Sequence, residues 1–348
     1  MRVAGSALAQ LTLTRFREFL REPEAVFWTF IFPLLLATGL GIAFRSRPAE
    51  VVRVGVLAGA PDAARVYDQL AADSALTVSL LDDSAAASAL RVGTVALVVV
   101  PAGENSAEYR YDVAREDART ARLIVDRTLQ RANGRADAVA VRESHVSEPG
   151  SRYIDFVLPG LLAMNLMGSG MWGIGFSIVD ARRKKLLKRF IATPMRKADY
   201  LASFLVMRLA LMVVEVTVIT TFGVLAFGVP LRGSLALFVL TCVLGALTFG
   251  SLGLLVASRA KTIEAASGLM NLIMLPMWVA SGVFFSAANF PAAVQPFIQA
   301  LPLTAVVDGV RGIMIQGIGW QQLAPELAVV SAWLVLSFGI ALRFFRWR

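Results

Sequence analysis

The sequence predicts a mainly α-helical polytopic membrane protein, with six transmembrane helices and an α/β extracytoplasmic domain inserted between the first and second spans. Three observations support this prediction. Hydrophobic residues make up 57% of the 348 positions, whereas soluble domains hold roughly 45–50%. Most of them fall in six long runs that contain almost no charge. One segment, residues 45–152, departs from that pattern and alternates strand-like and helix-like stretches.

The six runs match the thickness of a bilayer. A helix needs about 20 apolar residues to cross the hydrocarbon core. The first five runs reach about that length, and we expect the flanks of the shorter sixth to extend it. The predicted spans are residues 25–44, 156–179, 209–231, 233–258, 265–285 and 327–342.

The first 24 residues predict a separate interfacial helix. Leu8, Leu11, Phe16 and Phe19 recur at near-helical spacing with arginines between them, a pattern typical of an amphipathic helix lying in the membrane surface. The alternative is a plain cytoplasmic extension of the first span. The run that follows is longer than the 7–15 residue core of a signal peptide. We therefore expect a retained anchor.

The basic residues predict the orientation. They concentrate before the first run, at 182–197, at 259–261 and after the sixth run, while the short loops on the opposite side hold only Arg232 and Arg311. Arginine and lysine favour the cytoplasmic side of membranes, so both termini should be cytoplasmic in a multi-pass protein. Contact with membrane lipid, and not with nucleic acid, then accounts for the net charge of +9.

The inserted segment predicts a compact α/β domain without catalytic chemistry. Its strand-like stretches, at 51–57, 76–81, 94–101 and the alternating 107–113, are separated by helical patterns at 61–72, 84–91 and 118–132. The chain contains no GxSxG, HExxH or GxGxxG motif. One cysteine excludes a cysteine-rich metal site, and one histidine leaves little for histidine-based metal chemistry. We expect neither an enzyme nor a directly bound cofactor.

The loop at residues 180–200, DARRKKLLKRFIATPMRKADY, predicts a docking surface for a soluble partner. It holds eight basic residues between the second and third spans. We expect a helix over 181–191, in which Leu186, Leu187 and Phe190 offer apolar anchors. Pro194 should end that helix at or before Thr193. The alternative is an ordinary basic loop that only sets the topology.

Two further features lie within the transmembrane domain, residues 153–348. A charge in mid-span is costly, so Glu215 should face a cavity or a partner; we expect it to line the transport pathway near Asn165 or Asn271, or else to be structural. Residues 286–322 are too long and too rich in proline for one turn, which predicts a re-entrant segment. Asp308 and Arg311, three residues apart, would pair there as an outer gate.

Four segments, taken in order, resemble the type-2 family of ABC transporter permeases, found in bacterial exporters. Residues 20–36, LREPEAVFWTFIFPLLL, are similar to the family's interfacial helix and proline-bearing first span. Residues 181–208 are similar to its signature region between the second and third spans. Residues 269–285 resemble the fifth span, and residues 290–314 the re-entrant segment beyond it.

The resemblance implies a permease that pairs with an ABC-type ATPase subunit and with a second copy of itself or a homologous permease, in the bacterial cytoplasmic membrane. ATP would act through that partner, since the chain contains no GxxxxGK(S/T) phosphate loop. Many relatives carry an acidic residue and a Gly-Thr at the start of the coupling loop. Here Asp180 would supply the acid while Arg183 and its neighbours replace the small residues; the R-x-x-A-T-P element at 189–194 is intact.

A mostly apolar pathway favours export of a hydrophobic or amphipathic compound. Two other classes of protein compete with this reading. One is a membrane-anchored receptor or scaffold whose outer α/β domain binds a ligand without any ATPase. The other, a secondary transporter, is disfavoured because intramembrane charge is sparse and no repeated halves are visible in the sequence.

Overall fold

The computed structural model describes residues 7–44, 51–103, 106–136, 139, 150–186, 197–260 and 262–344. They form two compact units. The helical unit comprises Met1–Arg45 and Ser147–Arg348, and the α/β unit comprises Ser46–Val146. The sequence had predicted the insertion at residues 45–152, close to the second of these units.

Within the described ranges, six helices are long and apolar enough to cross a membrane, as predicted. The first span, Pro23–Ala43, is built from α2 (Pro23–Val26), a π-helical turn η1 (Phe27–Ile31) and α3 (Phe32–Ala43). It follows α1 (Ala7–Leu20). The remaining five are α7 (Tyr153–Arg183), α9 (Lys197–Phe227), α10 (Leu235–Arg259), α11 (Ile263–Ala280) and α14 (Trp320–Phe344).

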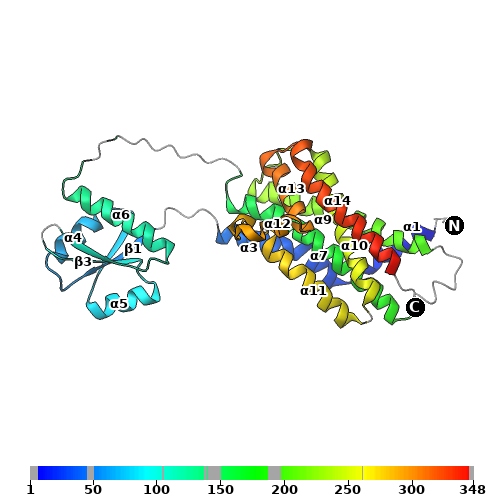
Figure 1. Cartoon of the computed structure of the whole chain (residues 1–348), viewed down its shortest axis with the longest axis horizontal. Coiled ribbons are helices and arrows are strands. Elements are labelled where there is room, and N and C mark those ends of the chain that lie inside the picture. The colour runs from blue at the N-terminus through cyan, green and yellow to red at the C-terminus, as the bar shows by residue number, and fades with distance from the viewer. Residues whose placement is uncertain are drawn as a thin grey trace. The chain divides into compact units, whose positions relative to one another are not determined.

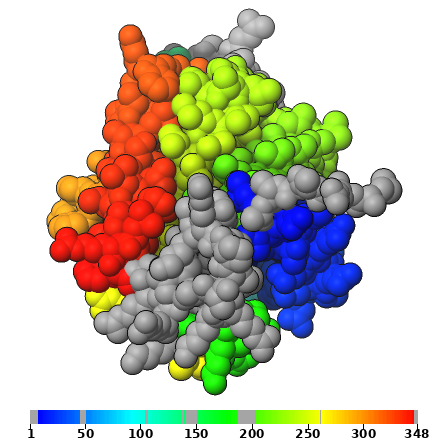
Figure 2. Space-filling model, turned by 90° about the vertical axis from the view of Figure 1, so that its right-hand side faces the viewer, coloured from blue at the N-terminus to red at the C-terminus, as the bar shows by residue number. Residues whose placement is uncertain are grey.

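The long helices run up and down between two ends of the helical unit. At one end, which we call the basic end, α7 finishes beside the end of α10, and the Arg259 guanidinium lies 4.6 Å from the Phe344 ring centroid. At the other end the Tyr153 hydroxyl donates to Phe284 O at 3.0 Å, and Gly233 N donates to Ile313 O at 3.0 Å. Figure 1 shows α12 and α13 at this second end, the hairpin end, and α1 at the basic end. Figure 2 looks onto the basic end, with α1 in blue and α14 in red.

Helix α7 occupies the centre of the helical unit. Most of its side chains are buried, and it contacts α3, α9, α10, α11 and α13. Glycine permits the closest of these approaches: a Cβ added at Gly253 of α10 would lie 2.7 Å from Met171 O, and one at Gly160 of α7 would lie 2.7 Å from Val283 O. Close backbone contact of this kind is how helices pack in lipid, where no hydrophobic force drives them together.

The segment between α11 and α14 is broken into short pieces, in keeping with its prolines. After two 3₁₀ turns, η2 (Ala287–Asn289) and η3 (Ala292–Val294), come α12 (Gln295–Gln299) and α13 (Pro302–Arg311), which continues into the π-helical η4 (Gly312–Gln316). The two halves of the segment are bent by 85°. Helix α13 is almost wholly buried against α7, α10 and α14. The buried part of the segment is thus helical, whereas its non-helical connections, such as Ser286, Pro291 and Gly317, are exposed.

The α/β unit is a four-stranded sheet in the order β2-β1-β3-β4. Strand β1 (Val52–Leu57) pairs in parallel with β2 (Leu76–Leu81) and β3 (Leu97–Pro101), and β4 (Ala107–Arg110) adds an antiparallel edge. Helices α4 (Ala63–Ala71) and α6 (Glu116–Ala132) cover one face, and α5 (Asp83–Val92) covers the other.

The boundary of β3 differs from its prediction for a local reason. The sequence pattern predicted a strand from residue 94, but the strand begins at Leu97. Gly93 has a φ of +78° and caps α5, and Thr94 N donates to Ala89 O of that helix at 2.9 Å. The first predicted strand residues are thus used to finish the preceding helix, as a left-handed glycine at a helix end allows.

Candidate functional site

The predicted docking loop, residues 180–200, begins inside the central helix α7. Helix α7 continues to Arg183, beyond the predicted span end at residue 179. Asp180 lies 2.6 Å from Lys184 Nζ and 3.6 Å from Arg183 Nη2, so the acidic residue is paired with its own helix end. Cations in the last turn also suit the negative end of the helix dipole.

The predicted helix over 181–191 is interrupted. Lys184 follows the end of α7, Lys185 takes a left-handed φ of 57°, and Leu186 is half-buried. A residue in that conformation ends a helix because the helical hydrogen-bond pattern cannot continue through it. The other residues assigned to ATPase coupling, Leu187, Phe190, Thr193 and Pro194, lie outside the described residues.

An arginine that the sequence analysis treated only as part of the basic loop ties this helix end to α10. Arg182 Nη1 donates to Ala257 O at 2.9 Å and to Ala260 O at 2.7 Å. Ala257 is in the last turn of α10 and Ala260 caps that helix, where carbonyl groups have no helical N–H partner. Arg182 therefore joins the start of the loop to the end of the fourth span.

A second arginine joins the far side of the loop to the N-terminal helix. Arg15 of α1 donates from Nε to the buried Ser203 Oγ of α9 at 3.0 Å. Its guanidinium carbon lies 3.3 Å from the centroid of the Phe204 ring, within the range of a cation–π contact. Helix α9 itself begins at Lys197, well before the predicted span start at residue 209. Both helices that flank the loop are thus held by arginine contacts at the basic end.

Inside the membrane-spanning region, Glu215 has a partner that the sequence analysis missed. Arg208 Nη1 donates to Glu215 Oε1 at 2.9 Å, and the side chains are only 3% and 0% exposed. The two residues are seven apart on α9, which places them on one face of the helix. That spacing was the available signal, but the predicted span began at residue 209 and excluded Arg208.

The same pair connects α9 to α7. Arg208 Nη2 donates to Leu166 O at 3.1 Å. Ser169 Oγ lies 3.0 Å from Glu215 Oε2 and 2.6 Å from Asn165 O, so its one hydrogen can serve one of these acceptors at a time. Both charges are therefore held by each other and by polar groups of α7, the arrangement that burial of charge demands.

The two asparagines predicted beside Glu215 have different surroundings. Asn165 lies one helical turn from Ser169 and is buried, and its Nδ2 has no hydrogen-bond partner among the described residues. Asn271 is exposed on α11, and no hydrogen bond joins it to Glu215 in the described part of the chain. Asn165 therefore contacts the polar cluster through its backbone carbonyl, which lies 2.6 Å from Ser169 Oγ, and neither asparagine side chain bonds Glu215 among the described residues.

At the hairpin end, Asp308 and Arg311 lie close together, and Arg311 has additional partners. Arg311 Nη1 is 3.6 Å from Asp308 Oδ1. Its shorter contacts are to backbone: Nη2 donates to Gly282 O at 2.7 Å and to Phe156 O at 3.0 Å. The guanidinium carbon also lies 3.8 Å from the Phe156 ring centroid. Arg311 thus fastens α13 to α7 and to the end of α11.

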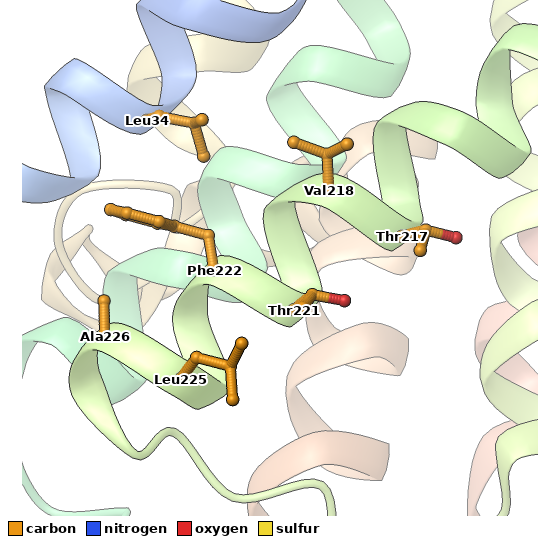
Figure 3. A pocket seen from close by; sticks show the side chains of 7 residues that line it. All are labelled: Leu34, Thr217, Val218, Thr221, Phe222, Leu225 and Ala226. Carbon is orange, nitrogen blue, oxygen red and sulfur yellow. The ribbon is translucent and has the colours of Figure 1, made fainter.

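An apolar groove of about 560 Å³ runs along α9 beside the first span. Figure 3 shows Leu34 of α3 facing a row of α9 side chains across it. Its polar lining is confined to two threonine hydroxyls, so the groove presents a surface suited to hydrocarbon. The α9 residues that line it are Thr217, Val218, Thr221, Phe222, Leu225 and Ala226.

Six apolar helices with α7 at their centre, a bent segment that buries α13, and a basic loop whose two ends are held by arginine contacts define a multi-pass α-helical membrane protein within the described residues. The chain belongs to the ABC-2 family of transporter proteins, whose family model matches residues 24–343. This match covers most of the chain and confirms the resemblance found in its segments.

Comparison with curated proteins finds ABC transporter proteins that match about half of this chain. The chain is 27% identical over 195 residues to ABC transporter G family member 20 of Dictyostelium discoideum, covering 56% of this chain and 27% of that protein. It is 26% identical over 187 residues to the probable multidrug ABC transporter permease YbhR of Escherichia coli, covering 53% of this chain and 51% of that protein. Nodulation protein J of Bradyrhizobium diazoefficiens is 27% identical over 204 residues, which are 57% of this chain and 76% of that protein.

Proposed function

We propose that this chain is the permease subunit of an ATP-driven ABC transporter that exports a hydrophobic or amphipathic compound across the bacterial cytoplasmic membrane. A separate ABC-type ATPase subunit binds and hydrolyses the ATP, and the chain itself binds no cofactor. Membership of the ABC-2 family supports this proposal, as do the names of relatives that are ABC transporter permeases.

The observation that carries the proposal is the way in which the loop between α7 and α9 is attached. Arg182 joins its first side to α10, and Arg15 joins its second side to α1. Inside the bundle, the Arg208–Glu215 pair connects α9 to α7, the two helices that flank the loop. A displacement of the loop by a partner is therefore passed to four helices through polar contacts, which have discrete and directional geometries.

The contact surface for lipid and a second subunit is inferred from the exposed face of α11. Leu272, Leu275 and Val279 of α11 are between 51% and 70% exposed, and α11 is the span that continues into the bent hairpin. We assign this face to lipid and to a second copy of the chain or a homologous permease. Both termini and the basic end lie in the cytoplasm, following the arginine distribution, and the α/β unit lies outside.

A pull-down tests the coupling loop. Tagged full-length protein is recovered from mildly solubilised membranes, wild type beside a Leu187→Asp, Phe190→Asp double variant. A matched control places two aspartates at exposed apolar residues of the α/β unit, Val113→Asp with Leu123→Asp, whose side chains are 60% and 70% exposed. The proposal expects an ABC-type ATPase with wild type and control, and its loss with the loop variant.

Two results would contradict the proposal. Retention of the ATPase by a loop variant that is recovered at wild-type yield and elutes as a single species would remove the loop from the interface. Failure of wild type to recover any ATPase in repeated mild preparations would favour a membrane-anchored receptor or scaffold.

A further inference from the structure

A polar cleft of about 330 Å³ lies at the hairpin end, between the α13–η4 segment and the start of α14. Five of its lining residues carry charged or amide side chains: Asp308, Arg311, Gln316, Gln322 and Glu326. Such a concentration of polar groups is unusual beside helices that otherwise bury apolar surface. Its volume is at the lower end of the range of small-molecule sites.

The acceptors in this cleft are not satisfied by the protein. Glu326 Oε2 is buried and has no hydrogen-bond partner among the described residues. Asp308 accepts no hydrogen bond within that part of the chain, and its ion-pair partner Arg311 is 3.6 Å away. A buried carboxylate oxygen without a donor costs more than an ordinary unmade hydrogen bond. Both carboxylates therefore have free capacity for a donor that comes from outside the chain.

Arg311 supplies few hydrogen-bond donors to the Asp308 and Glu326 carboxylates. Its Nε and Nη2 hydrogens are directed to Phe156 O and Gly282 O, and its plane is covered by the Phe156 ring. Counting two carboxylates and one guanidinium, the cleft carries a formal charge of −1 when all are ionised. One monovalent cation with N–H donors would balance the charge and satisfy the carboxylate oxygens together.

We propose that this cleft binds the ammonium group of an amine-bearing ligand, with Glu326 and Asp308 as acceptors and the two glutamine amides as further polar contacts. The ammonium can belong to a soluble amphipathic amine or to an aminophospholipid headgroup. A divalent metal fits less well, because the described residues hold no group of three or more metal-ligating side chains and a guanidinium lies beside the site. A role of the cleft in recognising transported cargo rests on the proposed function, whereas binding of an ammonium group does not depend on it.

The test for a soluble ligand uses 2-phenylethylamine as the probe and its neutral isostere 2-phenylethanol as the comparison. Both are titrated by calorimetry into full-length protein in a non-ionic detergent. Because a hydrogen bond to a charged group is worth about a tenfold change in affinity or more, we expect the amine to bind about tenfold more tightly than the alcohol. Glu326→Gln should remove that preference, with a smaller loss for Asp308→Asn.

A matched control removes a carboxylate elsewhere. Asp83→Asn alters an aspartate that is 82% exposed in the α/β unit, and it should leave amine affinity unchanged. Glu326→Gln preserves side-chain size, so an unchanged unfolding temperature separates loss of binding from loss of fold. Equal binding of amine and alcohol by wild type, or amine binding by Glu326→Gln at wild-type affinity, overturns a soluble-amine site.

A second arm tests the lipid source. Protein in nanodiscs that contain phosphatidylethanolamine and phosphatidylglycerol is released for native mass spectrometry, and the retained lipids are counted. Preferential retention of phosphatidylethanolamine, lost in Glu326→Gln, identifies a headgroup site. Absence of a Glu326-dependent preference in both arms refutes the proposal. Neither arm needs an ATPase, so this failure is distinguishable from a failure of the pull-down.

Discussion

Replacing Glu215 with leucine should be the most damaging single change in the helical unit. The substitution leaves the Arg208 guanidinium, which is 3% exposed, without its carboxylate. Of its hydrogen bonds within the described residues, Arg208 would keep the one to Leu166 O at 3.1 Å. Removing one partner of a buried ion pair costs about 3–5 kcal/mol, since the remaining charge cannot return to water without separating α7 from α9.

The double variant Arg208→Met, Glu215→Leu should recover most of that loss. Leu166 O remains within α7, where helical hydrogen bonding still serves it, and Ser169 can give its hydrogen wholly to Asn165 O at 2.6 Å. The double substitution therefore leaves neither Leu166 O nor the Ser169 hydroxyl without a hydrogen-bond partner. Replacement of a buried pair by apolar residues of similar size is often neutral or stabilising, so we expect the double variant within about 1 kcal/mol of wild type.

Equilibrium unfolding in mixed micelles, followed by circular dichroism, measures these free energies. Glu264→Leu is the control, because its carboxylate is exposed at the start of α11, and it should change the free energy of unfolding by less than about 1 kcal/mol. A Glu215→Leu variant as stable as wild type would refute the claim that the pair holds α7 to α9. The claim would also be refuted if the double variant lost as much free energy of unfolding as the two single variants lose together.

Three other predictions address the rest of the chain. The pKa of Asp73 lies below its ordinary value of 3.8 because Ala75 N–H and the Thr128 hydroxyl donate to its carboxylate. The resulting stability is present above that value and is lost as pH falls through the lower folded pKa, so Asp73→Asn should flatten acid unfolding of the α/β unit followed by circular dichroism. Gly253→Val should destabilise the helical unit by about 1–3 kcal/mol, measured by thermal unfolding, since a Cβ there would lie 2.7 Å from a backbone oxygen of α7. Ser106→Cys should react with a membrane-impermeant maleimide in intact cells, because the lone natural cysteine is buried and residue 106 is exposed; protection in intact cells with labelling after lysis would place the α/β unit inside.

The elements of the fold could largely be predicted from the sequence, because their signals are local. Uninterrupted apolar runs specify spans through the thickness of a bilayer, and the six predicted runs correspond to six helices. Alternation and helical spacing likewise predicted the elements of the α/β unit. Errors fell at the ends of elements, as at β3 and at the predicted coupling helix, where a single left-handed residue redirects the chain.

The contacts of the candidate site could be predicted only in part. The sequence marked Glu215, Asp308 and Arg311 as unusual because charge in an apolar context is costly wherever it lies. It did not identify the carbonyls that receive Arg311, which belong to residues 29 and 155 positions away. Nor did it reveal that Arg182 bonds the end of α10, since a basic residue beside a span looks the same whether it faces water or another helix.

The sequence by itself determined which segments are long and apolar enough to cross a membrane and where the basic residues concentrate, because hydrophobicity and charge act on each segment independently of its neighbours. Only the tertiary structure decided which helices share a polar contact. Arg208 and Glu215 meet because they share one face of α9, and they bond Leu166 and Ser169 because α7 passes that face. The physical reason is that hydrogen bonds and ion pairs act over a few ångströms, so their partners are chosen by packing and not by order along the chain.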